Sequence, residues 1–215
     1  MKKFMALLLV AGMTLSLTAC GGSTDTAKTD QAGGKDTFTA GFDQDFPPFG
    51  YVGDDGEFTG FDIEMATECA ARMGKKIVLQ PIDWDAKDME LEAGTIDCIW
   101  NGFTMNGRED QYTWTDPYMD NSQVVVVKKD SGINTLADLA GKVVEVQKES
   151  AAETALNDEE HADLMASFAQ LLSVGEYNTA FMDLESGAVD AVAIDIGVAQ
   201  FQIEGKEDQY QILDE

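Results

Sequence analysis

Basic residues are scarce in this sequence, which has 14 lysines and arginines against 40 aspartates and glutamates and a formal net charge of −26. A surface of this charge repels the phosphate backbone of nucleic acids and the headgroups of anionic lipids. The composition therefore argues against nucleic-acid binding, and we expect no nucleic-acid partner. The 44% of hydrophobic residues in a chain of 215 is enough for one large domain or two small ones.

Histidine and cysteine are also rare, with one histidine and three cysteines. His161 lies in an acidic stretch without His or Cys neighbours, so neither a zinc site nor a Ser–His–Asp set is expected. Cys69 falls in an expected helix and Cys98 in an expected strand. Export would permit a disulfide between them, but their apolar surroundings favour two buried free thiols. We expect no metal and no cofactor.

Two pairs of carboxylates stand two residues apart, Asp43 with Asp45 and Asp83 with Asp85. Such pairs can act in acid–base chemistry or bind calcium. The chain lacks the twelve-residue loop that makes a calcium site specific. Solvated acids of turns and helix caps are the better interpretation.

An apolar run near the N-terminus is typical of an export signal. Residues 1–19 have a basic start, an apolar centre and then small residues, and they are too short and wrongly flanked for a stable membrane span. The run ends in Leu-Thr-Ala-Cys at 17–20, which resembles the lipobox of bacterial lipoproteins. The resemblance implies cleavage before Cys20, diacylglycerol on its sulfur and acyl chains that hold the protein at a membrane face. A secretory signal with a chance cysteine is the alternative.

The remaining chain divides into a tether and an α/β region. Residues 20–36 contain no large apolar side chain, which predicts a flexible tether. Beyond them, expected strands and helices alternate, and this predicts an α/β fold with parallel strands in two successive units. Pro47 and Pro48 make 43–51 an expected irregular loop. Strands are expected at 38–42, 76–80, 96–100, 124–127, 142–146, 171–174 and 191–194. Helices are expected after an Asp62 N-cap, at 86–93, 136–139, 151–156 after a Ser150 N-cap, 178–185 and 196–203.

Residues 101–118 are the most informative stretch of the chain. They follow an expected strand and open with small residues that let a backbone approach a ligand closely: Gly102, Thr104 and Gly107. Arg108 then places a guanidinium in the loop, and its planar fork of donors fits a carboxylate in a two-pronged way. The pattern predicts a site for a small anion-bearing ligand at the carboxyl edge of a sheet. A surface arginine paired with Glu109 or Asp110 is the alternative.

Four ordered stretches of the sequence resemble motifs of the bacterial extracellular solute-binding proteins of family 3, the polar-amino-acid receptors of ABC importers. They are Gly-Phe-Asp-Gln-Asp-Phe-Pro-Pro-Phe-Gly-Tyr at 41–51, Gly-Phe-Asp-Ile-Glu at 60–64, Gly-Phe-Thr-Met-Asn-Gly-Arg with Trp-Thr-Asp-Pro-Tyr within 102–118, and Val-Asp-Ala-Val-Ala-Ile-Asp at 189–195. Together they are far more specific than any one alone. Many members have one more residue between the threonine and the arginine than stands between Thr104 and Arg108.

The resemblance implies a two-lobe, type II periplasmic-binding-protein-like fold. It places lobe 1 at 37–123, an interlobe hinge strand at 124–128 and lobe 2 at 129–215. Members of the family continue for several dozen residues past this point to finish lobe 1. The C-terminal part of lobe 1 is therefore expected to be missing, which would leave apolar surface uncovered around the helix that carries Ile63.

The implied function is capture of a free amino acid between two closing lobes, for delivery to an ABC permease. Such a receptor would be a monomer, anchored by lipid outside the cytoplasm, and not an enzyme. Two rivals stay open: a dehydratase-type enzyme of the same fold and a ligand-sensing lipoprotein. The sequence does not show which amino acid is bound.

The resemblance also implies a role for individual residues. Arg108 is expected to bind the ligand carboxylate, assisted by backbone N–H groups at Ser150 and Ala151, where a helix begins. Asp195 is expected to bind the ammonium group, because a carboxylate beyond a strand end suits a charge-assisted bond. The other expected ligand contacts are the Gly102 carbonyl, the Thr104 hydroxyl, a side-chain sandwich of Phe46 and Trp84, Asp43 in the cleft, and Gln147 as a reader of the side chain. Trp84 in the core and Gln147 as a solvated strand end are the alternatives.

Overall fold

The computed structural model describes residues 36–213. The expected export signal at 1–19, the lipid-bearing Cys20 and nearly all of the tether at 20–36 lie outside the described residues. Within residues 36–213, no helix has the length and apolar character needed to cross a bilayer. Cys69 and Cys98 are both free thiols.

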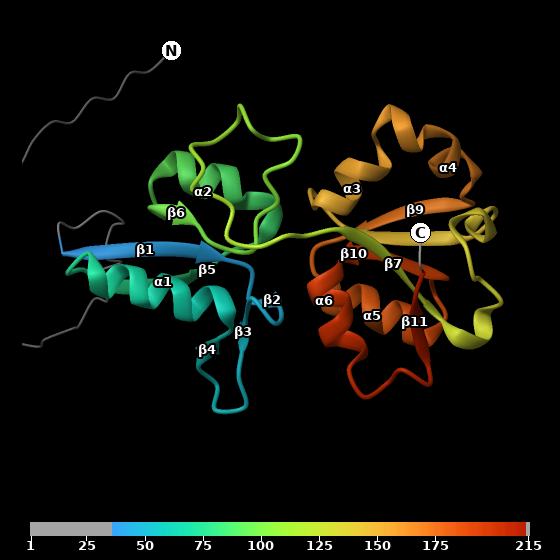
Figure 1. Ribbon diagram of the computed structural model, residues 1–215, viewed down its shortest axis with the longest axis horizontal. Coiled ribbons are helices and arrows are strands. Elements are labelled where there is room, and N and C mark those ends of the chain that lie inside the picture. The colour runs from blue at the N-terminus through green and yellow to red at the C-terminus, as the bar shows by residue number, and fades with distance from the viewer. Residues whose placement is uncertain (1–35, 214–215) are drawn as a thin grey trace, which may run out of the picture. The chain divides into compact units, whose positions relative to one another are not determined.

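Three parallel strands form the first sheet, in which β1 (Thr37–Phe42) lies between β5 (Lys76–Pro81) and β6 (Cys98–Ile99) (Figure 1). The strand expected at 96–100 is present but shorter. The register sets Phe42 opposite Pro81 and Gly41 opposite Ile99. All three strands therefore end at one edge, and the segments that follow them start close together.

Two helices connect the strands of this sheet, α1 (Phe61–Arg72) and α2 (Lys87–Ala93). Asp62 does not cap α1 as predicted. The N-cap is Gly60, and Asp62 lies inside the first turn, where its carboxylate accepts a hydrogen bond from the Tyr118 hydroxyl instead of from the helix backbone. Ile63 is buried, while Phe61 and Met73, at the two ends of the helix, are each 46% exposed.

A small antiparallel sheet occupies part of the region predicted to be an irregular loop. It pairs β2 (Asp45–Phe46) with β3 (Gly50–Val52), and β3 with β4 (Phe58–Thr59). The prediction was wrong because Pro47 and Pro48 do not occupy ladder positions. They lie in the turn between Phe46 and Gly50, which are paired, so the missing proline N–H groups interrupt no strand pairing.

Five strands form the second sheet in the order β11 (Tyr210–Ile212), β7 (Gln123–Lys128), β10 (Ala191–Asp195), β8 (Val143–Gln147) and β9 (Gln170–Val174). β8 is parallel to β9 and β10, and β7 is antiparallel to β10 and β11. The segment predicted to cross between lobes is thus a paired strand of this sheet. β11 was not predicted.

Helices cover both faces of the second sheet. Figure 1 shows α3 (Ala151–Leu156) and α4 (Ala162–Ser167) on one side, and α5 (Tyr177–Ser186) and α6 (Ile196–Ile203) on the other. Along β7, Val125 and Val127 belong to the core under α3, while Val126 belongs to the core under α5 and α6. A strand buried on both faces needs a continuous apolar run, which is why 124–127 was readable from the sequence.

Single turns of 3-10 helix complete the structure. They are η1 (Trp84–Ala86), η2 (Lys129–Ser131), η3 (Leu136–Leu139) and η4 (Glu159–His161). The helix predicted at 136–139 is therefore a 3-10 turn. Ser150 caps α3 as predicted, since its Oγ accepts the Glu153 N–H at 3.1 Å. The α4 helix was not predicted, because it is only six residues long and directly follows an acidic stretch.

Candidate ligand-binding site

The carboxyl ends of strands from both sheets supply the lining of one small pocket. Trp84 follows β5, the loop that contains Arg108 follows β6, Gln147 ends β8, and Asp195 ends β10. The lining consists of Phe46, Trp84, Asn101, Gly102, Phe103, Thr104, Arg108, Gln147, Ser150, Ala151 and Asp195. All the residues predicted to bind ligand are among them except Asp43. The cavity has a volume of about 10 Å³, enough for about one water molecule.

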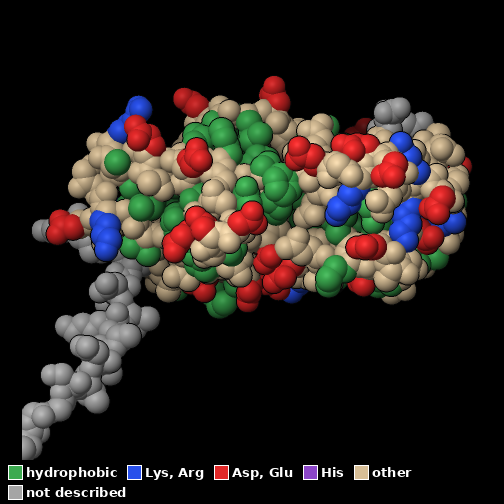
Figure 2. All heavy atoms as spheres, turned by 90° about the horizontal axis from the view of Figure 1, so that it is seen from below, with side chains coloured by type: hydrophobic (Ala, Val, Ile, Leu, Met, Phe, Trp, Pro, Cys, Tyr) green, Lys and Arg blue, Asp and Glu red, His purple; other side chains and the backbone are tan. Residues whose placement is uncertain are grey.

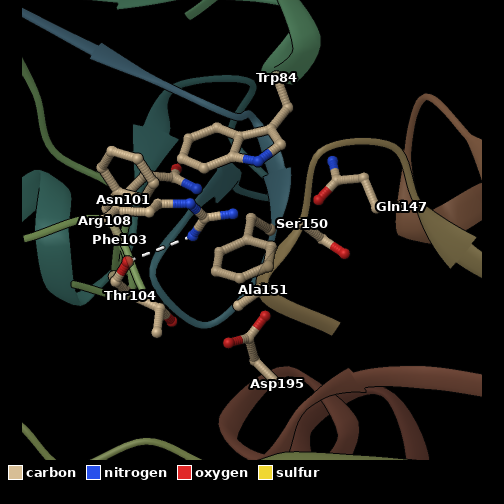
Figure 3. Close-up of a pocket in the computed structure, with 11 residues that line it drawn as sticks. Trp84, Asn101, Phe103, Thr104, Arg108, Gln147, Ser150, Ala151 and Asp195 are labelled. Carbon is tan, nitrogen blue, oxygen red and sulfur yellow. Dashed lines mark hydrogen bonds between the residues drawn. The ribbon is translucent and has the colours of Figure 1, made fainter. Parts of the chain in front are cut away.

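Arg108 is buried in this pocket and does not lie on the surface (Figure 3). Its Nη1 donates to the Thr104 carbonyl at 3.2 Å, and its Nη2 donates to the Glu149 carbonyl at 3.1 Å and to Thr154 Oγ1 at 3.3 Å. These acceptors are neutral, and no carboxylate within residues 36–213 forms an ion pair with Arg108. The alternative of a surface pair with Glu109 or Asp110 is not what the structure shows.

Three hydrogen bonds use three of the five N–H groups that a guanidinium carries. Two N–H groups therefore remain for another acceptor. The Phe103 ring lies 5.2 Å from the guanidinium carbon and covers one face of the group. Arg108 is thus a fixed, buried cation with unused donors.

Asp195 is the buried anion of the same pocket, with 5% of its surface exposed. Its Oδ1 accepts hydrogen bonds from the Asn121 amide and from Gln123 Nε2, the latter at 2.8 Å. Burial raises the pKa of Asp195, and these two amide donors oppose that shift. Figure 3 shows its carboxylate directed into the pocket below Arg108. Its hydrogen-bond partners carry no positive charge, so a cationic group of a ligand would give this carboxylate a charged partner.

Asn121 links Asp195 to the opposite wall of the pocket. Its side-chain amide donates both to Asp195 and to Thr104 Oγ1, the latter at 3.1 Å. The hydroxyl and the carboxylate predicted to share the ligand ammonium group are therefore held close together. The structure supplies the amide that joins them, which was not predicted.

Asp43 is absent from the lining of this pocket and lines a larger cavity beside it. Its backbone N–H donates to Asn101 Oδ1 at 2.8 Å, and its Oδ2 accepts from Gln147 Nε2 at 2.6 Å. Burial raises its pKa to about 6. Asp43 therefore braces Gln147, whose amide also donates to the Gly175 carbonyl at 2.9 Å. This amide is fully buried and is not the solvated strand end of the alternative interpretation.

Tyr118 ties the Gly102 loop to the start of α1. Its hydroxyl accepts the Gly102 N–H at 3.1 Å and donates to Asp62 Oδ1 at 2.9 Å. Asp62 is almost fully buried, and burial raises its pKa to about 6. Asp62 belongs to the sequence motif at 60–64, and Gly102 and Tyr118 belong to the motif within 102–118. These two motifs thus form one chain of hydrogen bonds that positions the Gly102 loop.

Ser150 and Ala151 are in the lining, but the Ser150 N–H is already used. It donates to the Gln147 carbonyl at 3.2 Å. Fewer backbone N–H groups at the start of α3 are therefore free to bind an anion than predicted. Arg108 is the main candidate for that role.

A second cavity, of about 490 Å³, adjoins the pocket at Trp84 and is strongly acidic. It is lined by Asp43, Gln44, Asp45, Pro81, Ile82, Asp83, Trp84, Asp85, Ala86, Glu90, Gly175 and Glu176. Half of these residues are acids and none is basic. Figure 2 shows the same imbalance on one face of the molecule, where acidic side chains greatly outnumber basic ones.

Some residues of the site were missed because their role depends on tertiary contacts. Asn101 and Phe103 are in the lining, and their position within the 101–118 stretch could have indicated it. Asn121 and Gln123 contact Asp195 because β7 runs antiparallel to β10, which sets Gln123 opposite Asp195. No local pattern in the sequence states that register.

Known proteins resemble this chain in sequence and in structure. The arginine-binding extracellular protein ArtP of Bacillus subtilis is 36% identical over 148 residues, which cover 68% of this chain and 56% of ArtP. The L-cystine-binding protein TcyJ of Escherichia coli K12 is 31% identical over 194 residues, which cover 89% of this chain and 69% of TcyJ. An ABC uptake transporter substrate-binding protein from Streptococcus pneumoniae, solved with bound histidine, superimposes with a TM-score of 0.78 at 35% identity and covers 82% of this chain and 74% of that chain.

The match to a family settles which proteins this chain is related to. Residues 38–179 match the bacterial extracellular solute-binding proteins, family 3. That range holds most of the pocket lining, including Arg108, and the superposition with the protein from Streptococcus pneumoniae covers more of the chain. The chain has the type II periplasmic amino-acid-binding fold of these neighbours, and it belongs to the bacterial extracellular solute-binding proteins of family 3.

Proposed function

We propose that this chain is the extracytoplasmic substrate-binding part of an amino-acid ABC importer, and that it holds one free amino acid in the pocket around Arg108. The main support for this proposal is the charge arrangement of the pocket. Arg108 and Asp195, a buried cation and a buried anion, line the same pocket, and each is bonded only to neutral groups. An amino acid brings the complementary carboxylate and ammonium, so each buried charge would gain a charged partner.

The remaining N–H groups of Arg108 would bind the ligand carboxylate, while its bonds to Thr104 and Glu149 stay in place. Asp195 and the Thr104 hydroxyl would bind the ammonium group. Phe46 and Trp84 line the pocket as buried aromatic rings and would flank the side chain. The α-carbon would thus sit between the ends of β6 and β10, with its side chain toward Trp84.

Entry of the ligand requires movement, because a cavity of about 10 Å³ is too small for an amino acid. We propose that residues 37–123 and 129–215 act as two lobes that separate and close around the ligand. β7 is paired on both sides, so it is held in its sheet. The hinge predicted at 124–128 would therefore bend at the amino end of β7, next to Ser122. The ligand contacts both lobes only when they are closed, so its binding energy favours the closed form.

The acidic second cavity supports a preference for a cationic side chain. A long side chain that passes Trp84 would enter a space lined by six carboxylates, of which only Asp85 forms an ion pair, with Lys148, in the described part of the chain. Two of the similar proteins are described with arginine or histidine, although a third is named for L-cystine. We therefore propose L-arginine or a similar basic amino acid as the ligand.

A thermal-shift screen against the common amino acids and L-cystine tests this function. A bound ligand raises the melting temperature, because a ligand at 100 times its dissociation constant stabilises a protein by about 2.7 kcal/mol. L-Arginine and L-lysine are expected to raise it most, since their side chains are cationic. L-Glutamate, whose side chain the acidic cavity would repel, should produce little shift. A shift with L-glutamate but not with L-arginine would contradict the basic preference, and no shift with any amino acid would contradict the function itself.

Binding without turnover is part of the proposal, so the chain is not an enzyme. The pocket offers fixed hydrogen-bond donors and acceptors for a zwitterion, and the similar proteins named above are binding proteins. Recovery of the bound amino acid unchanged after prolonged incubation would agree with this. The expected partner of the loaded protein is the permease of an ABC importer, and the binding protein itself would act as a monomer.

Membrane attachment through Cys20 is proposed from the sequence alone. The Leu-Thr-Ala-Cys stretch at 17–20 ends an export signal, and lipid on Cys20 would hold the protein at the outer face of the cell membrane. In cells, Cys20→Ser is expected to move most of the protein from the membrane fraction to the soluble fraction or the medium. Cys69→Ser, which changes a cysteine far along the chain, is the matched control and should leave fractionation unchanged. Membrane-bound Cys20→Ser protein would contradict the assignment.

A further inference from the structure

Glu149 accepts hydrogen bonds from three side chains, and two of them, Trp84 and Arg108, line the binding pocket. Its carbonyl accepts hydrogen bonds from Trp84 Nε1 at 3.3 Å and from Arg108 Nη2 at 3.1 Å. Its carboxylate accepts from Lys87 Nζ at 2.7 Å. Trp84, Lys87 and Arg108 all belong to residues 37–123, whereas Glu149 stands between β8 and α3.

The backbone of Glu149 is strained in a way that serves these contacts. Its φ is 57°, and it is the only non-glycine residue with positive φ among residues 36–213. A side chain in this region is disfavoured, and such outliers persist where the surrounding structure fixes them, often at functional sites. The Glu149 N–H is fixed by Glu153 Oε2 at 2.6 Å. The left-handed turn aims the carbonyl at Arg108 and Trp84 while the side chain reaches Lys87.

Lys87 makes the carboxylate of Glu149 important. The lysine side chain is 3% exposed, and its ammonium lies 5.3 Å from the centre of the Trp84 ring. Glu149 is the one residue that forms an ion pair with it in the described part of the chain. A buried ammonium without a counter-ion is costly. Residues 37–123 can therefore pack against the Glu149 segment without leaving the Lys87 charge unpaired only if Glu149 is present.

We propose that Glu149 is a positioning residue of the binding site, whose carbonyl orients Arg108 and Trp84 and whose pairing with Lys87 holds the site closed around a ligand. The role depends on the proposed function only in its effect on ligand release. Glu149 itself need not touch the amino acid. It keeps the Arg108 fork directed into the pocket with two N–H groups unused.

Three variants separate the parts of this role. Glu149→Gln keeps the size of the side chain and removes its charge. Lys87→Met removes the cation and keeps most of the apolar stem. Lys148→Met is the matched control, since Lys148 pairs with Asp85 at 2.7 Å between the same two segments of the chain. The Lys148 and Asp85 side chains are 53% and 37% exposed, and solvent-exposed pairs contribute little.

The first measurement needs no ligand. The indole N–H resonance of Trp84, assigned with Trp84→Phe, reports its hydrogen bond to Glu149. In Glu149→Gln and Lys87→Met we expect it to move toward the position of a solvated indole, because loss of the ion pair lets the two halves separate. In Lys148→Met it should stay unchanged. An unmoved resonance in both Glu149→Gln and Lys87→Met would overturn the proposal, and this holds even if no amino acid binds.

The second measurement is the dissociation rate of L-arginine by stopped flow. We expect Glu149→Gln and Lys87→Met each to raise it about tenfold or more, and the double variant to be no faster than either single variant, because both changes remove the same pair. Independent, multiplying effects would show two unrelated structural losses and would overturn the proposal. If the wild-type chain binds no amino acid, the proposed function fails, and the indole resonance alone decides the role of Glu149.

Discussion

Arg108→Ala is expected to abolish measurable binding of free amino acids. Removal of one partner of a buried charge pair costs about 2–5 kcal/mol, or roughly 30- to 4,000-fold in affinity. Arg108→Lys should recover little, because an ammonium keeps the charge but loses the planar fork and cannot make all three of the observed hydrogen bonds together with a two-pronged contact.

The stability of this variant has to be measured beside its affinity. The sequence places Arg108 in a loop, where a charge adds little to stability, but the structure buries Arg108 and bonds it to two backbone carbonyls. Each lost hydrogen bond contributes about 1 kcal/mol, so a lower melting temperature is expected. Calorimetry well below that temperature, on protein shown to be folded by circular dichroism, isolates the binding defect. Tight binding by folded Arg108→Ala would show that another group binds the carboxylate.

Asp195→Asn is expected to separate amino acids from their deaminated analogues. L-Arginine should lose about 2–5 kcal/mol of binding free energy, since its ammonium group would face a neutral amide. The analogue 5-guanidinopentanoate, which lacks the ammonium group, should lose much less. Asp190→Asn, at the other end of β10 and outside the pocket, is the matched control and should leave both affinities unchanged. Equal losses for both ligands in Asp195→Asn would show that Asp195 is only structural.

The pH dependence of binding gives a second test of Asp195. Burial raises the pKa of its carboxyl group, and only the ionised form can pair with an ammonium. Affinity for L-arginine should therefore be fully present above this raised pKa and should fall as the pH is lowered through it. The profile of Asp195→Asn should be flatter. Asp43, whose pKa is raised to about 6, is present in both proteins, so any contribution from it is shared.

The sequence predicted those segments in which a single local feature, such as an apolar run or a capping side chain, is pronounced. The run 124–127 is apolar on both faces and became β7, and the Ser150 hydroxyl before 151–156 became a cap. The antiparallel strands β2 to β4 were missed because they are two or three residues long, and because two prolines separate β2 from β3. Asp62 was misplaced because an acid before an apolar helix resembles a cap, whereas here it turns away to Tyr118.

The binding site was predictable to the extent that it lies at strand ends. Arg108, Gln147 and Asp195 each follow or end a strand, and parallel strands bring such residues to one edge. The residues that hold them, such as Asn121 and Glu149, were not predictable in this way. Lys87 and Glu149 are 62 positions apart, and Asn121 and Asp195 are 74 apart. Nothing in either local sequence identifies its partner.

Calorimetric titration of the wild-type chain with L-arginine and with agmatine tests the central claim most directly. The two ligands share a guanidinium and an amine, but agmatine lacks the α-carboxylate for which Arg108 is proposed. We expect saturable binding of one L-arginine per chain and binding of agmatine that is weaker by about 30-fold or more. Equal affinities for the two ligands, or no binding of L-arginine or of any other free amino acid, would contradict it.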